Sequence, residues 1–434
     1  MADFTIECFQ NEYLTRGAET MHAVITVTAA GTSAFTGAAT TDRSELLIVD
    51  TSGSMNGKKL RSVKEATAAA IDCIPDGARF GLITGNHQAE VVFPPSPPLA
   101  VASPKTRSDA KTEVKKFEAG GGTAIETWID MAKQVFNDIH GIRHAILLTD
   151  GKNESGSAEA LERALDQAEG VFQCDCRGVG DGWEVAELRK VANALLGDLD
   201  IVAEPEDLTA DFTRLIRQSL SRQLAEVSLR VWTPKAAEVV TLKQQEPFLD
   251  LTPNRIEVPP QAGDYATGSW GDESRDFHLA VRVPVGDVDD RMLAARVTLL
   301  VGDEPVGEGQ VLAVWTDDTA KSTRVHKRVA EVLGDAEVVD EIDEGLKAWR
   351  EGDDEKATGR FAKALSKARE NGNEALADLV LNVVVEDQTG RVRMKSNVSE
   401  IDRMTLDTQS RRTKRNPRRD PPEDPPAAAS VPAQ

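Results

Sequence analysis

Short apolar runs alternate with amphipathic helical patterns between about residues 42 and 222. The runs that we interpret as strands cover residues 45–49, 79–84, 144–149, 170–176 and 199–203. Between them, apolar residues recur on one helical face, as in Leu60, Val63, Ala70 and Ile71 or in Leu208, Phe212, Leu215 and Ile216. Near-continuous apolar strands separated by helices are typical of a mostly parallel sheet that is covered on both faces. The pattern therefore predicts a doubly wound, Rossmann-like α/β domain.

The two flanks of this domain alternate apolar and polar residues with a period of two. The alternation runs through residues 4–8, 227–231 and 277–283. Such patterning indicates antiparallel strands with one buried face. Because the N-terminal strands are too few to form a core alone, we place residues 1–41 in one all-β sandwich with residues 223–318. The α/β domain of residues 42–222 is then an insertion into this sandwich.

The pattern becomes helical from residue 319 to residue 386. Two apolar faces recur at helical spacing, one with Val339, Ile342, Leu346 and Trp349, the other with Ala357, Phe361, Ala364, Leu365 and Ala368. This favours a small hairpin of the tetratricopeptide type, with too few units for a repeat array. We expect residues 387–434 to be an extended segment followed by a disordered basic and Pro-rich tail, because so little apolar surface cannot order it.

A basic cluster marks the start of this tail. It comprises Arg411, Arg412, Lys414, Arg415, Arg418 and Arg419. The cluster could dock an anionic partner or fold back on the protein's own acidic surface, but a solvated tail is the interpretation that we favour. The hydroxyls of residues 404–410 are expected to be exposed, where a kinase could modify them.

Composition narrows the class of protein. The formal charge of −21 argues against binding to nucleic acid, because a polyanion would be repelled by most of the surface. No apolar run approaches the length of a membrane span, and the acidic N-terminus lacks the parts of a signal peptide. The four cysteines, Cys8, Cys73, Cys174 and Cys176, form no disulfide framework, and we interpret Cys174 and Cys176 as core residues rather than zinc ligands. We expect a cytoplasmic protein.

Polar residues crowd the end of the first buried strand, in the stretch ELLIVDTSGSMNGKKL of residues 45–60. A phosphate-binding loop fits poorly, because it is one residue too short and Lys59 stands where that loop has Ser or Thr. A catalytic serine would need a Gly-x-Ser-x-Gly elbow, which the stretch lacks. A helix N-cap formed by Ser52 or Ser54 is possible alongside a further role.

Two later loops supply matching oxygen atoms. Thr123 follows three glycines, and Asp150 ends a second buried strand. The loops at the carboxyl ends of such strands are where ligands bind in an open α/β sheet. Together with Asp50, Ser52 and Ser54, these residues offer two carboxylates and three hydroxyls. Hard oxygen donors suit Mg²⁺ or Mn²⁺, so the sequence predicts a site for one of these ions.

This constellation of residues resembles the metal-ion-dependent adhesion site of von Willebrand factor A domains, and the β flanks resemble those of the family's bacterial cytoplasmic members. The resemblance implies that Ser52 and Ser54 bind the metal directly, and that Asp50 and Asp150 act directly or through water. Thr123 would join them when a ligand is bound. A Glu or Asp of a protein partner would complete the coordination, and the helix of residues 206–220 would shift in metal-regulated relatives.

We therefore predict a metal-dependent protein-binding module without enzymatic activity, an adaptor or scaffold. The resemblance implies an association with AAA+ ATPases or phospho-signalling proteins. One competing function is a metal-assisted phosphatase or hydrolase with Asp50 as nucleophile, but Ser52 stands where a second aspartate is needed. Another alternative is a structural scaffold whose metal never exchanges ligands.

Overall fold

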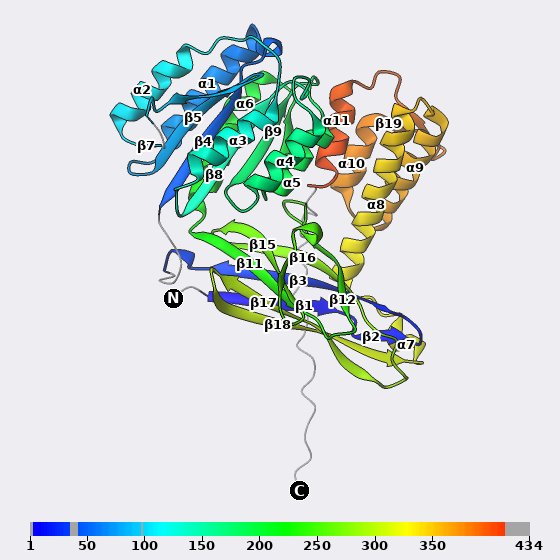
Figure 1. Cartoon of the computed structure of the whole chain (residues 1–434). Coiled ribbons are helices and arrows are strands. Elements are labelled where there is room, and N and C mark those ends of the chain that lie inside the picture. The colour runs from blue at the N-terminus through cyan, green and yellow to red at the C-terminus, as the bar shows by residue number, and fades with distance from the viewer. Residues whose placement is uncertain (1–2, 35–41, 97–98, 413–434) are drawn as a thin grey trace.

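The computed structural model describes residues 3–34, 42–96 and 99–412 of the chain. They build an α/β domain, two packed β-sheets beneath it and a group of helices beside both (Figure 1). No helix within these ranges is long and apolar enough to cross a bilayer. The predicted disorder of the basic and Pro-rich tail falls on residues 413–434, which lie outside the described part.

The α/β domain contains one seven-stranded, mostly parallel sheet. Its strands are β4 (Arg43–Asp50), β5 (Arg79–Gly85), β6 (Ala89–Phe93), β7 (Ala100–Val101), β8 (Ile142–Thr149), β9 (Gln173–Val179) and β10 (Leu199–Val202). The order is β10-β9-β8-β4-β5-β6, with β7 also paired to β5, and only β6 and β7 run antiparallel to their neighbour. Sequence patterning missed these two short edge strands and placed the start of β9 too early, because Gly170 to Phe172 form the turn after a helix.

Helices cover both faces of this sheet. They are α1 (Lys58–Cys73), α2 (Pro104–Lys115), α3 (Ile125–Phe136), α4 (Ala158–Ala168), α5 (Val185–Ala194) and α6 (Leu208–Ser221). Alternate residues of β4 enter different cores: Leu46 and Ile48 pack with α3, α4 and α5, whereas Leu47 and Val49 pack with α1, α2 and α6. Two buried faces explain the continuous apolar run of β4 and confirm the predicted doubly wound domain.

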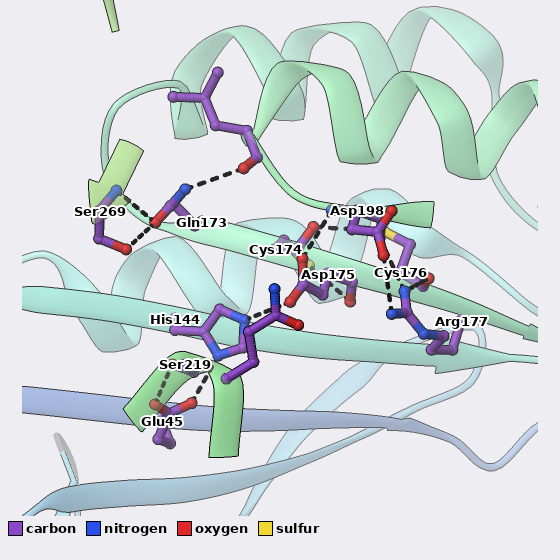
Figure 2. A network of polar contacts seen from close by, with 12 residues as sticks. Glu45, His144, Gln173, Cys174, Asp175, Cys176, Arg177, Asp198, Ser219 and Ser269 are labelled. Atoms are coloured by element: carbon purple, nitrogen blue, oxygen red, sulfur yellow. Dashed lines mark hydrogen bonds and ion pairs between the residues drawn. The ribbon is translucent and has the colours of Figure 1, made fainter. Parts of the chain in front are cut away.

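A buried polar network crosses the sheet from β4 to β9 (Figure 2). The imidazole of His144 on β8 lies between two carboxylates, with Nδ1 2.7 Å from Glu45 on β4 and Nε2 3.0 Å from Asp175 on β9. Ser219 on α6 donates to Glu45 at 2.6 Å, and the buried Arg177 binds Asp211 on the same helix at 2.9 Å. The network therefore fastens α6 to three neighbouring strands. Cys174 and Cys176 on β9 are fully buried, as predicted for core residues.

The charge of His144 follows from its neighbours. Burial by itself lowers the pKa of this imidazole, but the two carboxylates outweigh burial and raise the pKa from 6.5 to about 9. Both ring nitrogens therefore carry protons at neutral pH and donate to Glu45 and Asp175. The imidazolium compensates carboxylates that would be costly to bury alone.

We expect the free energy of unfolding to fall as the pH rises through about 9, because His144 then loses its proton in the folded protein. A folded pKa above the unfolded value contributes stability fully below pH 6.5, and the shift corresponds to about 3 kcal/mol. Urea denaturation between pH 7 and 10 should show this slope for the wild type and for the exposed control His140→Gln. His144→Gln should have a shallower slope, and equal slopes in all three proteins would contradict the assignment.

The two sheets beneath the α/β domain contain strands from both flanks of the sequence. One sheet has the order β1-β3-β16-β12-β13, with β1 (Asp3–Gln10), β3 (Thr20–Ala30), β16 (Glu273–Arg282), β12 (Glu238–Gln244) and β13 (Leu249–Asp250). The other has the order β14-β15-β11-β17-β18-β2, with β14 (Ile256–Val258), β15 (Ala262–Trp270), β11 (Leu224–Trp232), β17 (Arg291–Val301), β18 (Glu304–Thr316) and β2 (Tyr13–Thr15). Apolar residues of both sheets share one core, which includes Ile25 on β3 and Trp270 on β15. Ser269 on β15 donates its backbone N–H to Gln173 on β9 at 2.9 Å, which ties these sheets to the α/β domain.

The C-terminal group consists of helices and one small hairpin. Its elements are α7 (Thr319–Ser322), α8 (Lys327–Arg350), α9 (Asp354–Glu370), α10 (Glu374–Val383), β19 (Val384–Glu386), β20 (Val392–Met394) and α11 (Glu400–Gln409). Helices α8 and α9 approach so closely at Gly345 that a Cβ there would lie 2.6 Å from Phe361. The core face of α8 contains Ile342 and Leu346 as predicted, with Trp349 packed against it. Its first member is the buried Val338 rather than the predicted Val339, because the spacing up to Leu346 is four residues.

Helix α11 replaces the extended segment that we expected. Ser399 and Asp402 form a capping box at its start, in which each side chain binds the other residue's backbone N–H. Met404 enters the core shared by α3, α4 and α5, whereas Leu406 enters the core of the C-terminal helices. The helix thus joins two cores, and that tertiary burial gives order to a segment with a weak pattern of its own.

The residues around α11 also correct our interpretation of the basic cluster. Arg411 binds Asp343 on α8, and Arg412 binds Asp198, just before β10, and Asp200 on β10. These two arginines therefore fold back on the acidic surface, which was the alternative that we did not favour. Two of the hydroxyls that we expected to be exposed within residues 404–410 are buried: Thr408 and Ser410 are each only 3% accessible to solvent. The remaining members of the cluster lie outside the described residues.

Asp407 joins the α/β domain to the C-terminal helices. Its carboxylate accepts from Arg189 on α5 and from Arg350 at the end of α8, both at 2.8 Å. We expect Asp407→Asn to lower the free energy of unfolding by about 2 kcal/mol, because both charge-assisted bonds are weakened at a nearly buried site. Chemical denaturation of the full chain would measure the loss, with exposed Asp378→Asn as the control. The same midpoint for both variants would contradict this role.

Candidate functional site

The five predicted metal ligands come together at the carboxyl edge of the sheet. Asp50 is the last residue of β4, and Asp150 directly follows β8, which pairs with β4 in parallel. The short helical turn η2 (Gly53–Met55) carries Ser54, with Ser52 just before it. The Ser54 hydroxyl donates to Asp150 at 2.6 Å, and its oxygen lies 3.0 Å from that of Ser52.

The glycine-rich loop brings Thr123 to the same place. The backbone N–H of Gly53 donates to the carbonyl of Gly121 at 2.9 Å, and the N–H of Gly120 donates to the carbonyl of Thr51 at 2.8 Å. Gly121 has a φ of +80°, a conformation that other residues rarely adopt. Gly121 is therefore needed for the close approach of two loops that are far apart in the sequence.

Three hydroxyls converge around Gly151. A Cβ atom built on this glycine would lie 2.9 Å from the Thr123 oxygen, 3.5 Å from that of Ser54 and 3.8 Å from that of Ser52. One point in space is thus within reach of all three oxygens, and the absent side chain of Gly151 leaves it open. This arrangement fits the predicted oxygen-donor site.

The two carboxylates are buried, and the electrostatics favour a cation. Asp50 and Asp150 are fully inaccessible to solvent, whereas Ser54 is exposed. Burial raises the pKa of Asp50, and the nearby charge of Asp150 raises it further, although hydrogen bonds from Thr149 and Ser52 oppose this. A positive ion at this position would relieve the cost of burying two like charges.

The donor set limits how tightly an ion could be held. Across the described ranges, no group of three or more His, Cys, Asp or Glu side chains could hold a metal. An ion at this site would depend on hydroxyls for part of its coordination, with only two charged ligands. The residues fit a Mg²⁺ or Mn²⁺ ion of modest affinity better than a tightly bound structural metal.

The capping alternative for the serines is wrong. The side chain of Ser52 accepts no backbone N–H of the turn that it precedes, and α1 begins after Gly57, which has no side chain to contribute. The hydroxyls of Ser52 and Ser54 point to each other and to Asp150 instead. Their place in the sequence is therefore explained by the site rather than by the helix.

Sequence reasoning missed two residues of this site. The hydroxyl of Thr149 donates to Asp50, and the ammonium of Lys59 forms an ion pair with Asp150. Thr149 directly precedes the predicted ligand Asp150, so its position in the sequence could have indicated a role at the site. Lys59 was considered only as a mismatch to a phosphate loop, and the sequence does not show that α1 directs its side chain back to the strand ends.

The helix that was expected to shift in metal-regulated relatives is present as α6. It begins with the turn η3 (Pro205–Asp207) and packs against α1, with Phe212, Leu215 and Ile216 buried. At its far end, Ser219 belongs to the network around His144. The structure thus connects this helix to the sheet at the edge opposite to the candidate site.

We expect Gly151→Ala to weaken Mg²⁺ or Mn²⁺ binding by about tenfold or more, because its methyl group would occupy the space between the three hydroxyls. The control is Gly120→Ala in the neighbouring loop, where a Cβ has no atom within 4 Å. Isothermal titration calorimetry on the full chain measures both, with circular dichroism to check the fold. Equal affinities for the two variants would mean that the ion binds elsewhere.

Comparison with known proteins identifies the same region. The family model for the von Willebrand factor type A domain matches residues 46–153, and a model for the type A C-terminal domain matches residues 367–410. A solved von Willebrand factor type A structure from Catenulispora acidiphila is 41% identical, with a TM-score of 0.90, over 95% of this chain and 97% of that chain. An ArnB paralog, VWA2, from Sulfolobus acidocaldarius has a TM-score of 0.62 at 14% identity, over 95% of this chain and 98% of its own, which shows a shared fold only.

Curated relatives match over shorter stretches. An uncharacterized protein, sll0103, from Synechocystis sp. is 25% identical over 50% of this chain and 50% of its own length. Inter-alpha-trypsin inhibitor heavy chain H4 from Bos taurus is 28% identical over 35% of this chain and 18% of its own length. The chain thus spans half or less of the length of the curated relatives that it matches.

Proposed function

Since this chain belongs to the von Willebrand factor type A family, we propose that it is a metal-dependent protein-binding module, an adaptor or scaffold of a bacterial cytoplasm. Domains of this family generally mediate protein–protein interaction. The observation that carries the proposal is the convergence of three hydroxyls beside two buried carboxylates. The metal would be Mg²⁺ or Mn²⁺, held at an adhesion site made of Asp50, Ser52, Ser54, Thr123 and Asp150.

Each residue has a distinct part in this proposal. Asp50 and Asp150 provide the negative charge that attracts a divalent cation, and their burial keeps water from screening it. The hydroxyls of Ser52, Ser54 and Thr123 add oxygen atoms without adding charge. Two carboxylates just neutralise the ion, so it keeps its attraction for a further carboxylate from a partner. The exposed position of Ser54 indicates the side from which the partner approaches.

The charge of the whole chain restricts the partner. The net charge of −21 repels acidic surfaces, so the metal would be a small positive spot in a negative field. A suitable partner offers one Glu or Asp, surrounded by neutral or basic residues that tolerate this field. An AAA+ ATPase or a phospho-signalling protein is the partner class that we propose.

The competing enzymatic function has no positive support. A phosphatase with Asp50 as nucleophile needs an acid or base close to the reacting group. Among the described residues, the side chains that hydrogen-bond to Asp50 or Asp150 are hydroxyls and the Lys59 ammonium. These groups can orient or neutralise a carboxylate, and members of the family are generally non-enzymatic interaction modules. A binding function therefore accounts for the site more simply.

The decisive measurement is partner capture that depends on both the metal and Thr123. We expect Thr123→Ala to keep most metal affinity but to weaken the partner by about tenfold or more, since its hydroxyl serves the ligand-bound state. Asp50→Asn should lose metal and partner together. Pull-down from native lysate with and without EDTA identifies the partner, and titration with the purified partner measures its affinity.

Two control variants accompany this experiment. Thr127→Ala removes a hydroxyl from the same region, one that bonds only to the carbonyl of Ala124 at 2.8 Å, and Asp130→Ala removes an exposed carboxylate from α3. Both should bind metal and partner as the wild type does. Unchanged partner affinity in Thr123→Ala and Asp50→Asn, with metal lost from the latter, would show that the metal is structural and recognition lies elsewhere.

A further inference from the structure

Helix α1 begins with two lysines at the end of the helix where cations are least favourable. Lys58 and Lys59 are its first two residues, and its first turn contains no acidic residue. The backbone N–H groups there carry partial positive charge, so a Lys side chain at this position needs compensation from elsewhere. The two lysines obtain it in different ways.

The pair formed by Lys58 lies on the surface. Its ammonium contacts Glu206 in η3, and more than half of each side chain is exposed, 62% for the lysine and 55% for the glutamate. Water and salt screen such a pair, which contributes little to stability. Lys58 is therefore a natural reference for its neighbour.

The pair formed by Lys59 reaches into the candidate metal site. Its side chain is 30% exposed, whereas its partner Asp150 is completely buried. The other oxygen of Asp150 accepts the Ser54 hydroxyl at 2.6 Å. Both oxygens of this proposed metal ligand are therefore engaged by groups of the protein itself, and one of those groups is a cation.

The stem of Lys59 also packs beside the loop after β9. A Cβ on Gly180 would lie 3.9 Å from both Cε and Nζ of the lysine, so the ammonium end runs between this loop and the site. Gly180 has a φ of +66°, which a larger residue would rarely adopt. The path of the side chain is thus set by tertiary packing as well as by charge.

We propose that Lys59 is a tethered cation that neutralises Asp150 and must be displaced before a divalent ion can bind. The inference rests on the metal site proposed above. Two carboxylates are balanced by one divalent ion, so an ammonium left on the same carboxylate adds a repulsive charge at short range. Because the lysine stem is long and flexible and its end is partly exposed, the ammonium can move into solvent.

This competition gives Lys59 a defined role. It lowers the affinity for the ion, so that the site fills only above a threshold concentration set by this residue. It also reduces the cost of burying Asp150 next to Asp50 when the ion is absent. Lys59 is thus a positioning residue that sets metal affinity without being a ligand.

The test compares neutral replacements of the two neighbouring lysines in the full chain. We expect Lys59→Met to bind Mg²⁺ and Mn²⁺ about tenfold more tightly than the wild type, because the competing charge is gone. Lys59→Gln, which can still hydrogen-bond to Asp150, should also bind more tightly and remains informative if the Met variant folds poorly. Lys58→Met is the matched control and should bind as the wild type does. Isothermal titration calorimetry measures the affinities.

Thermal unfolding provides a second readout. In EDTA, Lys59→Met should melt below the wild type, because Asp150 loses its cation, whereas Lys58→Met should melt as the wild type does. Added Mg²⁺ should raise the melting temperature of Lys59→Met by more than that of the wild type, since stabilisation grows with the ratio of ligand concentration to Kd. A merely structural ion pair would give the first effect without the second.

Each outcome of the titrations is decisive. Tighter binding in both Lys59 variants, or binding in them alone, supports the tethered cation. If the wild type binds the ions and the Lys59 variants bind equally or more weakly, this inference is overturned while the metal site remains. If no variant binds either ion at millimolar concentration, the proposed metal site and its competitor are both overturned.

Discussion

Burying carboxylates in a closely packed sheet is the constraint on which this structure depends. The paired strands β4 and β8 have acidic side chains at both ends, with Glu45 at the amino end of β4 and Asp50 and Asp150 at the carboxyl edge. Each buried charge requires hydrogen bonds and a compensating cation, because the interior screens charge far less than water. The two ends meet this requirement differently, and the difference separates a structural network from a candidate binding site.

At the amino end, the cation that compensates the buried carboxylates is itself fully buried. The His144 imidazolium lies between Glu45 and Asp175 and has no exposure to solvent. At the carboxyl edge, hydroxyls and the partly exposed Lys59 ammonium surround Asp50 and Asp150, which leaves one formal negative charge beyond the single lysine. A closed network suits the side that holds α6 and the lower sheets. A network whose cation is partly exposed, and can therefore be displaced, suits the side that would accept an ion and a partner.

Much of the fold and the site could be predicted from the sequence. The continuous apolar run of β4 indicated a sheet covered on both faces, and the donors at the ends of β4 and β8 had to lie close together because the strands are parallel. The glycines before Thr123 indicated a close approach of two loops, as Gly121 shows. The signals failed where ordering depends on distant partners, as in α11, which has a modest pattern of its own. On α8 only the first member of the predicted face differs, because Val338 and not Val339 is buried.

The sequence by itself determined the alternation of strands and helices in the α/β domain, and the chemistry of the five donors. These features are local, since they depend on periodicity and on residue type at the end of a strand. Only the tertiary structure decided that Lys59 reaches Asp150, that His144 is held between two acids, and that Asp407 joins α5 to α8. These contacts join residues far apart in the chain. The electrostatic interaction between their charged groups becomes strong only where folding removes the water between them.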